Sequence, residues 1–416
     1  MGGGTRNLIT SVESVPLPGR PATDRIAGTP YKRVVLLFST LSFVSLMTLF
    51  SFTSILGDLK NQLALTNAQF GLLLSAFSIA FATAQIPGGI FSDKCGGKIV
   101  SSVGVTIMAI AALSFSFSSD YIEFLILRCL AGFFGGLILP SSVKLLSDWY
   151  PSNERGIALG IFGLGQGLGF VVTYAVGSIV VQYFGWRMGS IFSGMLGLAA
   201  AVLAFVFLKN TTGTNIASPL PSKLATEGNF KRNLLLLVAV NFTALSVLSG
   251  TLQFTPQFLL LRFNFSTITG GFVTSLVGIT NIVASYSGGV SSKKFGGSYV
   301  VIGSMLMCVV LPAFLGYSYS TGFVFVLVAL VGFATMFYFG PLFAGVARVG
   351  RERPGTVFGV FNATSFGASA LSPLILGYIL DSTHEFELAF ASLSVIALIG
   401  LGAALTLKRT SFFARD

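Results

Sequence analysis

Charged side chains are scarce in this sequence. Only 9% of the 416 residues are Asp, Glu, Lys or Arg, whereas 53% are hydrophobic and the mean hydropathy is +0.84. Because a soluble globular domain carries about 25% charged residues, this composition excludes that class and predicts an integral membrane protein. An outer-membrane barrel would need segments of about ten residues with alternating polarity, and the sequence has none. We therefore predict an all-α membrane protein.

Histidine and cysteine are also rare. His384 is the single histidine, and it stands among glutamates in a predicted loop. The three cysteines, Cys95, Cys129 and Cys308, have neither a metal-ligand spacing nor an evident pairing. We therefore expect no catalytic site, no metal and no cofactor, and predict that the protein is not an enzyme.

Negative charge is the scarcer of the two signs, which leaves a net charge of +11. When the N-terminus is placed in the cytoplasm and the chain crosses the membrane twelve times, all but four of the 25 Lys and Arg residues fall on the cytoplasmic side. The exceptions are Lys60, Arg187 and Arg262 outside and Arg128 within a helix. This positive-inside bias predicts cytoplasmic termini in an inner or plasma membrane, and it makes a nucleic-acid partner unnecessary.

Hydrophobic runs of the length needed to cross a bilayer, about 20 residues, divide the chain into two halves. We predict a disordered cytoplasmic tail over residues 1–30, a six-helix bundle over 31–208, a polar linker over 209–232, a second six-helix bundle over 233–408 and a short tail over 409–416. The first tail lacks the apolar core of a signal peptide.

The two halves repeat each other at an offset of 200 residues. Residues 89–98 read GIFSDKCGGK, and residues 289–298 read GVSSKKFGGS. The segments 66–71 and 266–271 match at the same offset, and the first of them has the Thr and Gln spacing of a capping box that opens a helix. An internal repeat on this scale predicts two pseudo-symmetric bundles.

The glycine-rich segment also carries a family resemblance. Gly89, Asp93 and Lys94, followed by a Gly-Gly pair and a lysine, resemble the signature between the second and third helices of the major facilitator superfamily. Gly97 departs from the pattern, because the family usually has an arginine there. The resemblance implies twelve membrane helices in two six-helix bundles, alternating access, and a solute site between the bundles. Segments 85–89 and 355–373 resemble the anion:cation symporter and nitrate porter branches.

The same resemblance implies a conformational gating motif. Its residues in this chain are Gly89, Asp93, Lys94, Gly96, Gly97, Lys98, Arg155 and Gly355. Within it, the Asp93 carboxylate is expected to meet Arg155 or the positive N-terminal end of the helix that opens at Gly355, and so to hold an outward-open state. Lys293 replaces the acid in the second half.

Arg128 is the most informative single residue. It shares a helix face with Gly132 and two further glycines, so it is not expected to face lipid. A charge within the membrane costs at least about 2.5–3.5 kcal/mol, which calls for a partner or a purpose. Two interpretations stay open: an anion or coupling site, or a structural arginine bonded to helix carbonyls or to Glu123.

Other polar residues of the predicted spans are candidates for the lining of the central cavity. They are Gln85, Gln166, Gln253, Gln257, Tyr338 and Asn362. Each is also explained as a hydrogen-bonding residue between helices. Together with Arg128 they favour a small polar or anionic solute, since an arginine can bind a carboxylate or phosphate with two hydrogen bonds.

We predict a monomeric secondary transporter that takes up a small anion with H⁺ or Na⁺ as the coupling ion. Nitrate is disfavoured because Gln85 stands in helix 2, where nitrate porters have an arginine, and helix 8 has no arginine. The first alternative is a proton-coupled exporter of amphipathic compounds, which the lack of an acid near the middle of any span disfavours. The second is a membrane sensor or assembly partner without transport activity.

Overall fold

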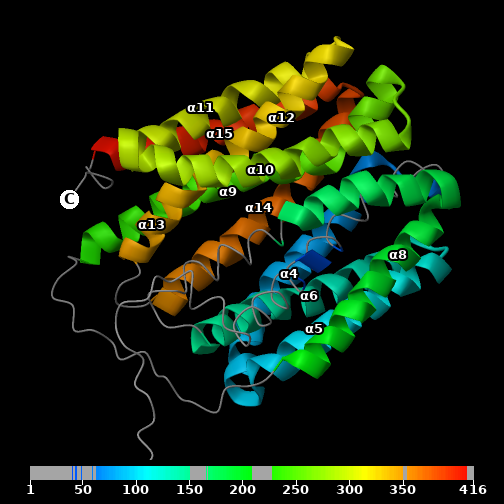
Figure 1. Cartoon of the computed structure of the whole chain (residues 1–416). Coiled ribbons are helices and arrows are strands. Elements are labelled where there is room, and N and C mark those ends of the chain that lie inside the picture. The colour runs from blue at the N-terminus through cyan, green and yellow to red at the C-terminus, as the bar shows by residue number, and fades with distance from the viewer. Residues whose placement is uncertain are drawn as a thin grey trace, which may run out of the picture.

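The protein is built from long helices arranged in two layers (Figure 1). The computed structural model describes residues 62–149, 167–208, 227–349 and 354–409, together with positions 40, 43, 44, 48, 59 and 165. Within these residues, ten helical segments are long and apolar enough to cross a membrane, and no strand is present. The predicted first helix and the terminal tails lie almost wholly outside the described residues.

The described helices of the first half lie in the lower layer of Figure 1. They are α4 (Asn67–Cys95), α5 (Gly97–Ser114) with the 3₁₀ turn η1 (Phe115–Phe117), α6 (Tyr121–Trp149), the π-helical η2 (Val172–Val176) and α8 (Gly177–Phe207). Gly185, with φ 80° and ψ 168°, divides α8 into the end of one crossing and the whole of the next.

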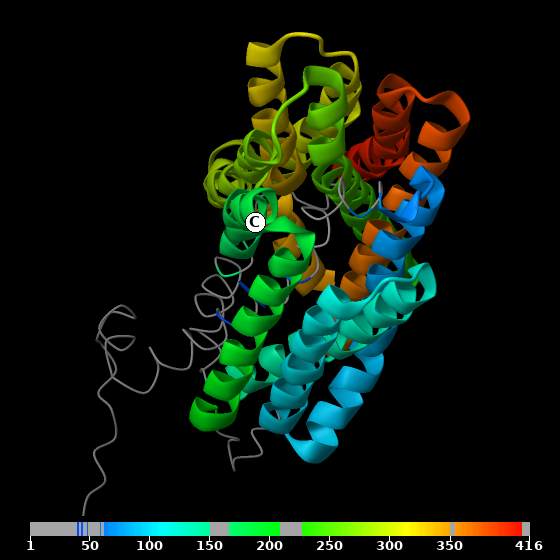
Figure 2. The same cartoon turned by 90° about the vertical axis from the view of Figure 1, so that its right-hand side faces the viewer.

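The second half forms the upper layer, and α14 reaches down beside α4 (Figures 1 and 2). Its helices are α9 (Glu227–Phe263), α10 (Thr267–Phe295), α11 (Gly297–Gly316), α12 (Thr321–Phe337), α13 (Phe339–Val349), α14 (Pro354–Thr383) and α15 (Phe386–Arg409). The starts of α4, α6, α10 and α12 lie at one end of the bundle, which also holds the end of α14. We call it the Asp381 end, and the opposite end, where α4 finishes, the Lys94 end.

The repeat seen in the sequence is confirmed in the backbone. Gly96 links α4 to α5 with φ 84° and ψ 142°, and Gly296 links α10 to α11 with φ 92° and ψ 142°. The turns before α4 and α10 also match, because Ala64 has φ 48° and Asn264 has φ 54°. Equivalent helices therefore begin and end at equivalent residues in the two halves.

Helix starts follow the capping signals in the sequence. The Thr66 hydroxyl accepts from the Gln69 backbone N–H at 3.1 Å, and the Gln69 side chain accepts from Thr66 N at 3.0 Å, which confirms the predicted capping box. Ser266 caps α10 in the same way, with its hydroxyl 3.1 Å from Thr269 N.

Glycines set the spacing between helices. A β-carbon at Gly132 of α6 would collide with the backbone of Phe77 in α4, and one at Gly332 of α12 would crowd Val277 in α10. These contacts sit 200 residues apart, so the same helix pair packs in the same way in both halves. Close packing of small residues is the expected mode of association where lipid removes the hydrophobic driving force.

One boundary differs from the sequence prediction, and one predicted crossing contains a break. Helix α9 begins at Glu227, inside the predicted 209–232 linker, because a helix can continue beyond the hydrocarbon layer that hydropathy detects. The tenth crossing is interrupted between α12 and α13 at Tyr338. Pro341 has no N–H to donate to the Phe337 carbonyl, which removes a helical hydrogen bond at that break.

Candidate functional site

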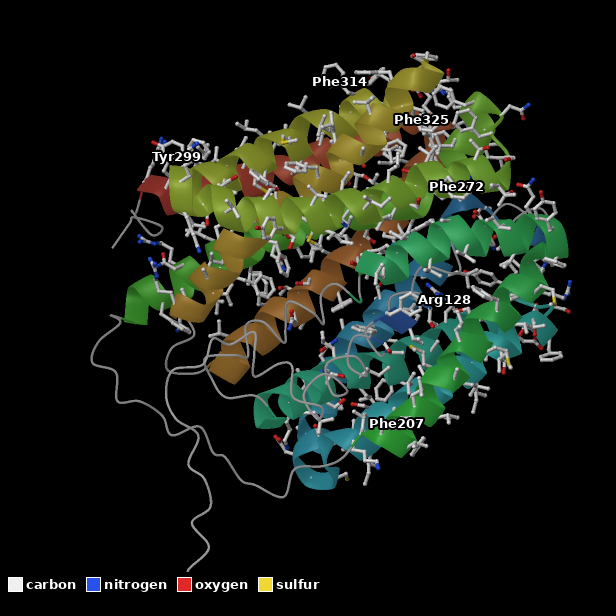
Figure 3. The ribbon with its side chains drawn as sticks, in the orientation of Figure 1. Arg128, Phe207, Phe272, Tyr299, Phe314 and Phe325 are labelled. Atoms are coloured by element: carbon white, nitrogen blue, oxygen red, sulfur yellow. The ribbon has the colours of Figure 1, made fainter. Side chains whose placement is uncertain are left out.

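Arg128 lies in the interior of the first half, where α6 packs on α4 (Figure 3). Its side chain is 1% exposed, whereas the labelled aromatics at the periphery, such as Tyr299 at 60% and Phe314 at 57%, face outward. The expectation that Arg128 does not face lipid is therefore confirmed.

The position of Arg128 follows from the packing of α6 on α4. Gly132 rests on the backbone of Phe77 and Gly136 on that of Phe81, each one helical turn further along. This register brings Arg128 to the turn of α4 that ends at Leu73, and Arg128 Nε donates to the Leu73 carbonyl at 3.1 Å. The glycines thus allow the close approach that seats the arginine.

An aromatic ring and a carbonyl orient the guanidinium. Its Cζ lies 4.7 Å from the centre of the Phe77 ring, a cation–π arrangement. A bond to a helix carbonyl was one of the two interpretations of this residue, and it is present. The other structural partner that we considered, Glu123, accepts from Ser119 N at 3.1 Å at the start of its own helix.

A row of phenylalanines leads from Arg128 to the other half. The rings of Phe77 and Phe81 are 5.9 Å apart, and those of Phe81 and Phe366 are 4.1 Å apart, which joins α4 to α14. Further contacts between the halves are polar: Ser75 Oγ donates to the Ala370 carbonyl at 2.5 Å, and Tyr174 OH donates to the Leu252 carbonyl at 2.8 Å. Arg128 is thus close to the surface on which the halves meet.

Two of the other candidate residues hydrogen-bond to groups other than Arg128. Gln257 Nε2 donates to Asn67 Oδ1 at 3.1 Å at the Asp381 end, and the Gln253 amide donates to Ser249 of its own helix. Gln85 is buried, and its amide nitrogen has no partner in the described part of the chain. Asn362 is half-buried in α14, and Gln166 lies outside the described residues.

Tyr338 belongs to a polar cluster in the second half that the sequence did not single out. Its hydroxyl donates to Asn241 Oδ1 at 2.8 Å, and the Asn241 amide donates in turn to the Ser365 hydroxyl. All three side chains are at least 90% buried and come from α9, α14 and the break after α12. The polar residues along the α9 sequence are the only sequence signal that could have indicated this cluster.

The gating motif lies at the Lys94 end. Asp93 forms an ion pair with Lys144 of α6, with Nζ and Oδ1 2.6 Å apart, and the same Nζ donates to the Ser92 carbonyl at 2.9 Å. Arg155, the predicted partner, lies outside the described residues, so that contact stays a prediction. The sequence analysis did not identify Lys144, because it stands 51 residues from its partner.

The glycines and lysines of the motif take different roles. Gly96 forms the turn with a positive φ, and Gly97 packs on Ser141 and Leu145 of α6 without room for a side chain. Gly89 faces open space, Lys94 is exposed, Lys98 is half-buried, and Gly355 lies in the first turn of α14. The departure from the family pattern at Gly97 therefore coincides with a tight helix contact.

Comparison with known proteins places this geometry among transporters. A family model described as Major Facilitator Superfamily matches residues 38–373. The chain is 25% identical over 372 residues to the hexuronate transporter of Bacillus subtilis (strain 168). The match covers 82% of this chain and 88% of the relative. It is 28% identical over 397 residues to a protein of the same organism described as a probable galactarate/D-glucarate transporter, covering 83% and 85%.

A solved structure shares the fold. A bacterial homologue of the human lysosomal transporter Spinster, in an inward-facing and occupied conformation, superposes with a TM-score of 0.78. The match covers 92% of this chain and 98% of that chain at 16% identity, so the likeness concerns the fold alone.

Proposed function

Since the chain belongs to the major facilitator superfamily and is therefore an integral membrane transporter of a small solute, we propose that it takes up a small carboxylated solute of the sugar-acid kind. Transport proceeds by alternating access of the two halves, with H⁺ or Na⁺ as the coupling ion. The termini lie in the cytoplasm of an inner or plasma membrane, as the distribution of Lys and Arg predicts.

The buried guanidinium of Arg128 carries this proposal. A charge inside a membrane protein costs at least about 2.5–3.5 kcal/mol to place, and such residues commonly mark the path of a solute or ion. Arg128 lies beside the contact surface of the halves, and its planar fork can bind both oxygens of a carboxylate. The Leu73 carbonyl and the Phe77 ring hold it in one orientation for that purpose.

The names of two relatives support the class of solute. One is a hexuronate transporter, and the other is described as a probable galactarate/D-glucarate transporter. Such solutes combine a carboxylate with several hydroxyl groups. The cluster of Asn241, Tyr338 and Ser365 offers amide and hydroxyl groups in the opposite half, where they can exchange their mutual hydrogen bonds for bonds to a sugar.

The distribution of acids argues against the exporter alternative. In the described helices, every Asp and Glu stands near a helix end, including Asp93, Asp148, Asp381 and Glu387. An organic cation would therefore meet no carboxylate in the middle of the described spans, whereas an anion would meet Arg128.

A ligand-stabilisation experiment tests the proposal. The purified protein is heated with hexuronate, galactarate and inorganic phosphate in one series and with lipophilic organic cations in another. A ligand at 100 times its Kd raises the free energy of unfolding by about 2.7 kcal/mol. We expect a sugar acid to raise the Tm of the wild type but not that of Arg128→Gln.

Arg187→Gln is the matched control, because it removes one arginine from an exposed position of the same half. It should respond to the sugar acid as the wild type does. Arg128→Lys should bind more weakly than the wild type, since an ammonium lacks the two-pronged geometry. Stabilisation by organic cations alone would instead favour the exporter, and an equal response of Arg128→Gln would remove Arg128 from the site.

A further inference from the structure

A carboxylate of one half caps the start of a helix in the other half. Asp381, near the end of α14, accepts from Asn67 N through Oδ1 at 2.7 Å and from Ala68 N through Oδ2 at 2.6 Å. These are the first two residues of α4, whose N–H groups have no partner within their own helix. Hydrogen bonds to an ionised acceptor are strong, and the positive end of the helix dipole adds to them.

The local cap of α4 leaves these two groups uncovered. The Thr66 hydroxyl accepts a hydrogen bond from Gln69 N, the third N–H of the helix. Asp381 accepts from the first and the second N–H. All three N–H groups therefore have an acceptor only while the two halves touch at this end. Separation of the halves there would leave two N–H groups and one carboxylate to water.

The backbones around this contact are closely fitted. A β-carbon at Gly377, one turn before Asp381, would collide with the Asn67 carbonyl, and one at Gly71 would collide with the Pro373 carbonyl. Gln257 of α9 adds a hydrogen bond to the Asn67 side chain at 3.1 Å. The carboxylate is therefore held where α14 and α4 have no room between them.

The halves also meet where α8 packs on α10, and there a neutral side chain takes the place that Asp381 has between α14 and α4. Gln182 of α8 accepts from Ile268 N in the first turn of α10 through Oε1 at 2.8 Å. Ile268 is the repeat equivalent of Ala68, and Gln182 lies one position from the equivalent of Asp381. The two crossings thus use the same device, but only one of them carries a charge.

We propose that Asp381 is a charge-dependent latch between the halves, a positioning residue that sets how often the bundle opens at the Asp381 end. The inference rests on the proposed alternating access. The groups that donate to Asp381, the backbone N–H groups of Asn67 and Ala68, are both neutral. Its charge is thus stabilised by the start of α4.

Asp381→Asn tests the latch, because it keeps the shape and removes the charge. The amide offers one acceptor oxygen and turns an NH₂ group towards the second N–H. Asp120→Asn is the matched control: the Asp120 carboxylate also accepts from a helix start, Ile122 N at 3.0 Å, but within its own half. Both changes remove one acid at the same end of the bundle.

The readout is the distance between spin labels on two exposed residues of the Asp381 end, at Phe117→Cys in the first half and Thr321→Cys in the second. The exposed Cys95 and Cys129 are replaced by serine. Loss of a charged hydrogen bond worth about 1.5–3 kcal/mol predicts that Asp381→Asn raises the ratio of open to closed molecules by roughly tenfold or more. Asp120→Asn should leave the ratio unchanged.

Gln182→Glu tests the latch in the opposite direction, because it adds a carboxylate where α8 meets the start of α10. It should lower the open population, and it tests the same principle if Asp381→Asn cannot be purified. An unchanged distance distribution in Asp381→Asn, or an equal shift in Asp120→Asn, would overturn the latch. So would an unchanged distribution in Gln182→Glu.

Sugar-acid flux, measured on the same proteins in liposomes, separates this inference from the proposed function. If Asp381→Asn opens the Asp381 end while no variant moves a sugar acid, the latch stands and the solute assignment falls. If the wild type transports a sugar acid but Asp381→Asn keeps the closed distances, the solute assignment stands and the latch falls.

Discussion

At the residue scale, two charges are stabilised by backbone groups of α4. Arg128 meets the Leu73 carbonyl, and Asp381 meets the N–H groups of Asn67 and Ala68. A cation thus lies beside a carbonyl in the body of the helix, and an anion lies at the N-terminus, which is the favourable end for a negative charge. Each charge also lies at or near the surface shared by the two halves.

Asp93 gives a prediction at this scale. It is 74% exposed and paired to Lys144, and exposed ion pairs contribute about 0–1 kcal/mol. We expect Asp93→Asn to slow turnover by up to about fivefold while changing solute affinity less, because the pair lies at the Lys94 end and outside the proposed site. Initial rates of uptake and a binding isotherm on the same preparation measure the two effects.

A double-mutant cycle shows whether the pair is responsible. If Asp93 acts through Lys144, then Lys144→Met should slow turnover equally and the double variant should be no slower than either. Lys94→Gln, which changes the exposed neighbour of Asp93, is the control. Full additivity would mean that Asp93 acts through another partner, such as the predicted Arg155, and normal turnover in Asp93→Asn would remove the gating role.

At the element scale, single residues determine where helices end. Gly96 and Gly296 turn the chain between consecutive helices with a positive φ and an extended ψ, a combination that is essentially restricted to glycine. Pro341 interrupts the tenth crossing and leaves Tyr338 at the break, where its hydroxyl reaches Asn241. Helix ends and breaks therefore place the polar groups of the second half.

The turn at Gly96 gives the second prediction. Gly96→Ala should lower the free energy of unfolding by about 1–3 kcal/mol, because alanine cannot adopt φ 84° and ψ 142° without strain. Gly296→Ala should behave alike. Gly89→Ala is the control, since a β-carbon there meets no atom within 4 Å and the position is helical.

Thermal unfolding of the purified variants measures this effect. Gly89→Ala should be neutral or stabilising by up to about 1 kcal/mol, because alanine favours the helix. Equal Tm values for Gly96→Ala and Gly89→Ala would contradict the backbone that the structure assigns to the turn.

At the scale of the whole molecule, the two halves meet along two crossings, α4 with α14 and η2 and α8 with α10. Glycines make both crossings tight, since Gly71 and Gly271 each face a backbone carbonyl of the opposite half. The aromatic contact of Phe81 with Phe366 continues the first crossing towards the middle of the bundle. Movement of one half against the other must therefore break contacts at defined positions.

The orientation in the membrane gives the third prediction. Cys95 is exposed at the Lys94 end, which the distribution of Lys and Arg predicts to be cytoplasmic, whereas Phe117 is 83% exposed at the opposite end. In a Cys129→Ser background, a membrane-impermeant maleimide should modify Cys95 in inside-out vesicles but not in cells with an intact membrane.

The reciprocal variant completes this experiment. Phe117→Cys, in a chain that also carries Cys95→Ser, should react in intact cells. The buried Cys308 should react in neither preparation. Labelling of Cys95 from outside would invert the predicted topology and leave the fold unchanged.

The sequence by itself determined the membrane class, the repeated halves, the capping box at Thr66 and the burial of Arg128. These features depend on composition, on helical periodicity and on residues a few positions apart, so they can be read along the chain. The candidate site was predictable only in part, because the sequence indicated Arg128 and Tyr338 but not Asn241 or Ser365.

Only the tertiary structure decided which groups meet across the chain. Asp381 and Asn67 are 314 positions apart, and Gln182 and Ile268 are 86 apart. Such pairs depend on the angle and register at which two complete helices pack, and glycine contacts summed over both crossings set that register. No short stretch of sequence determines how these distant helices pack. The pairing of Asp381 with the start of α4 could therefore be identified only in the folded structure.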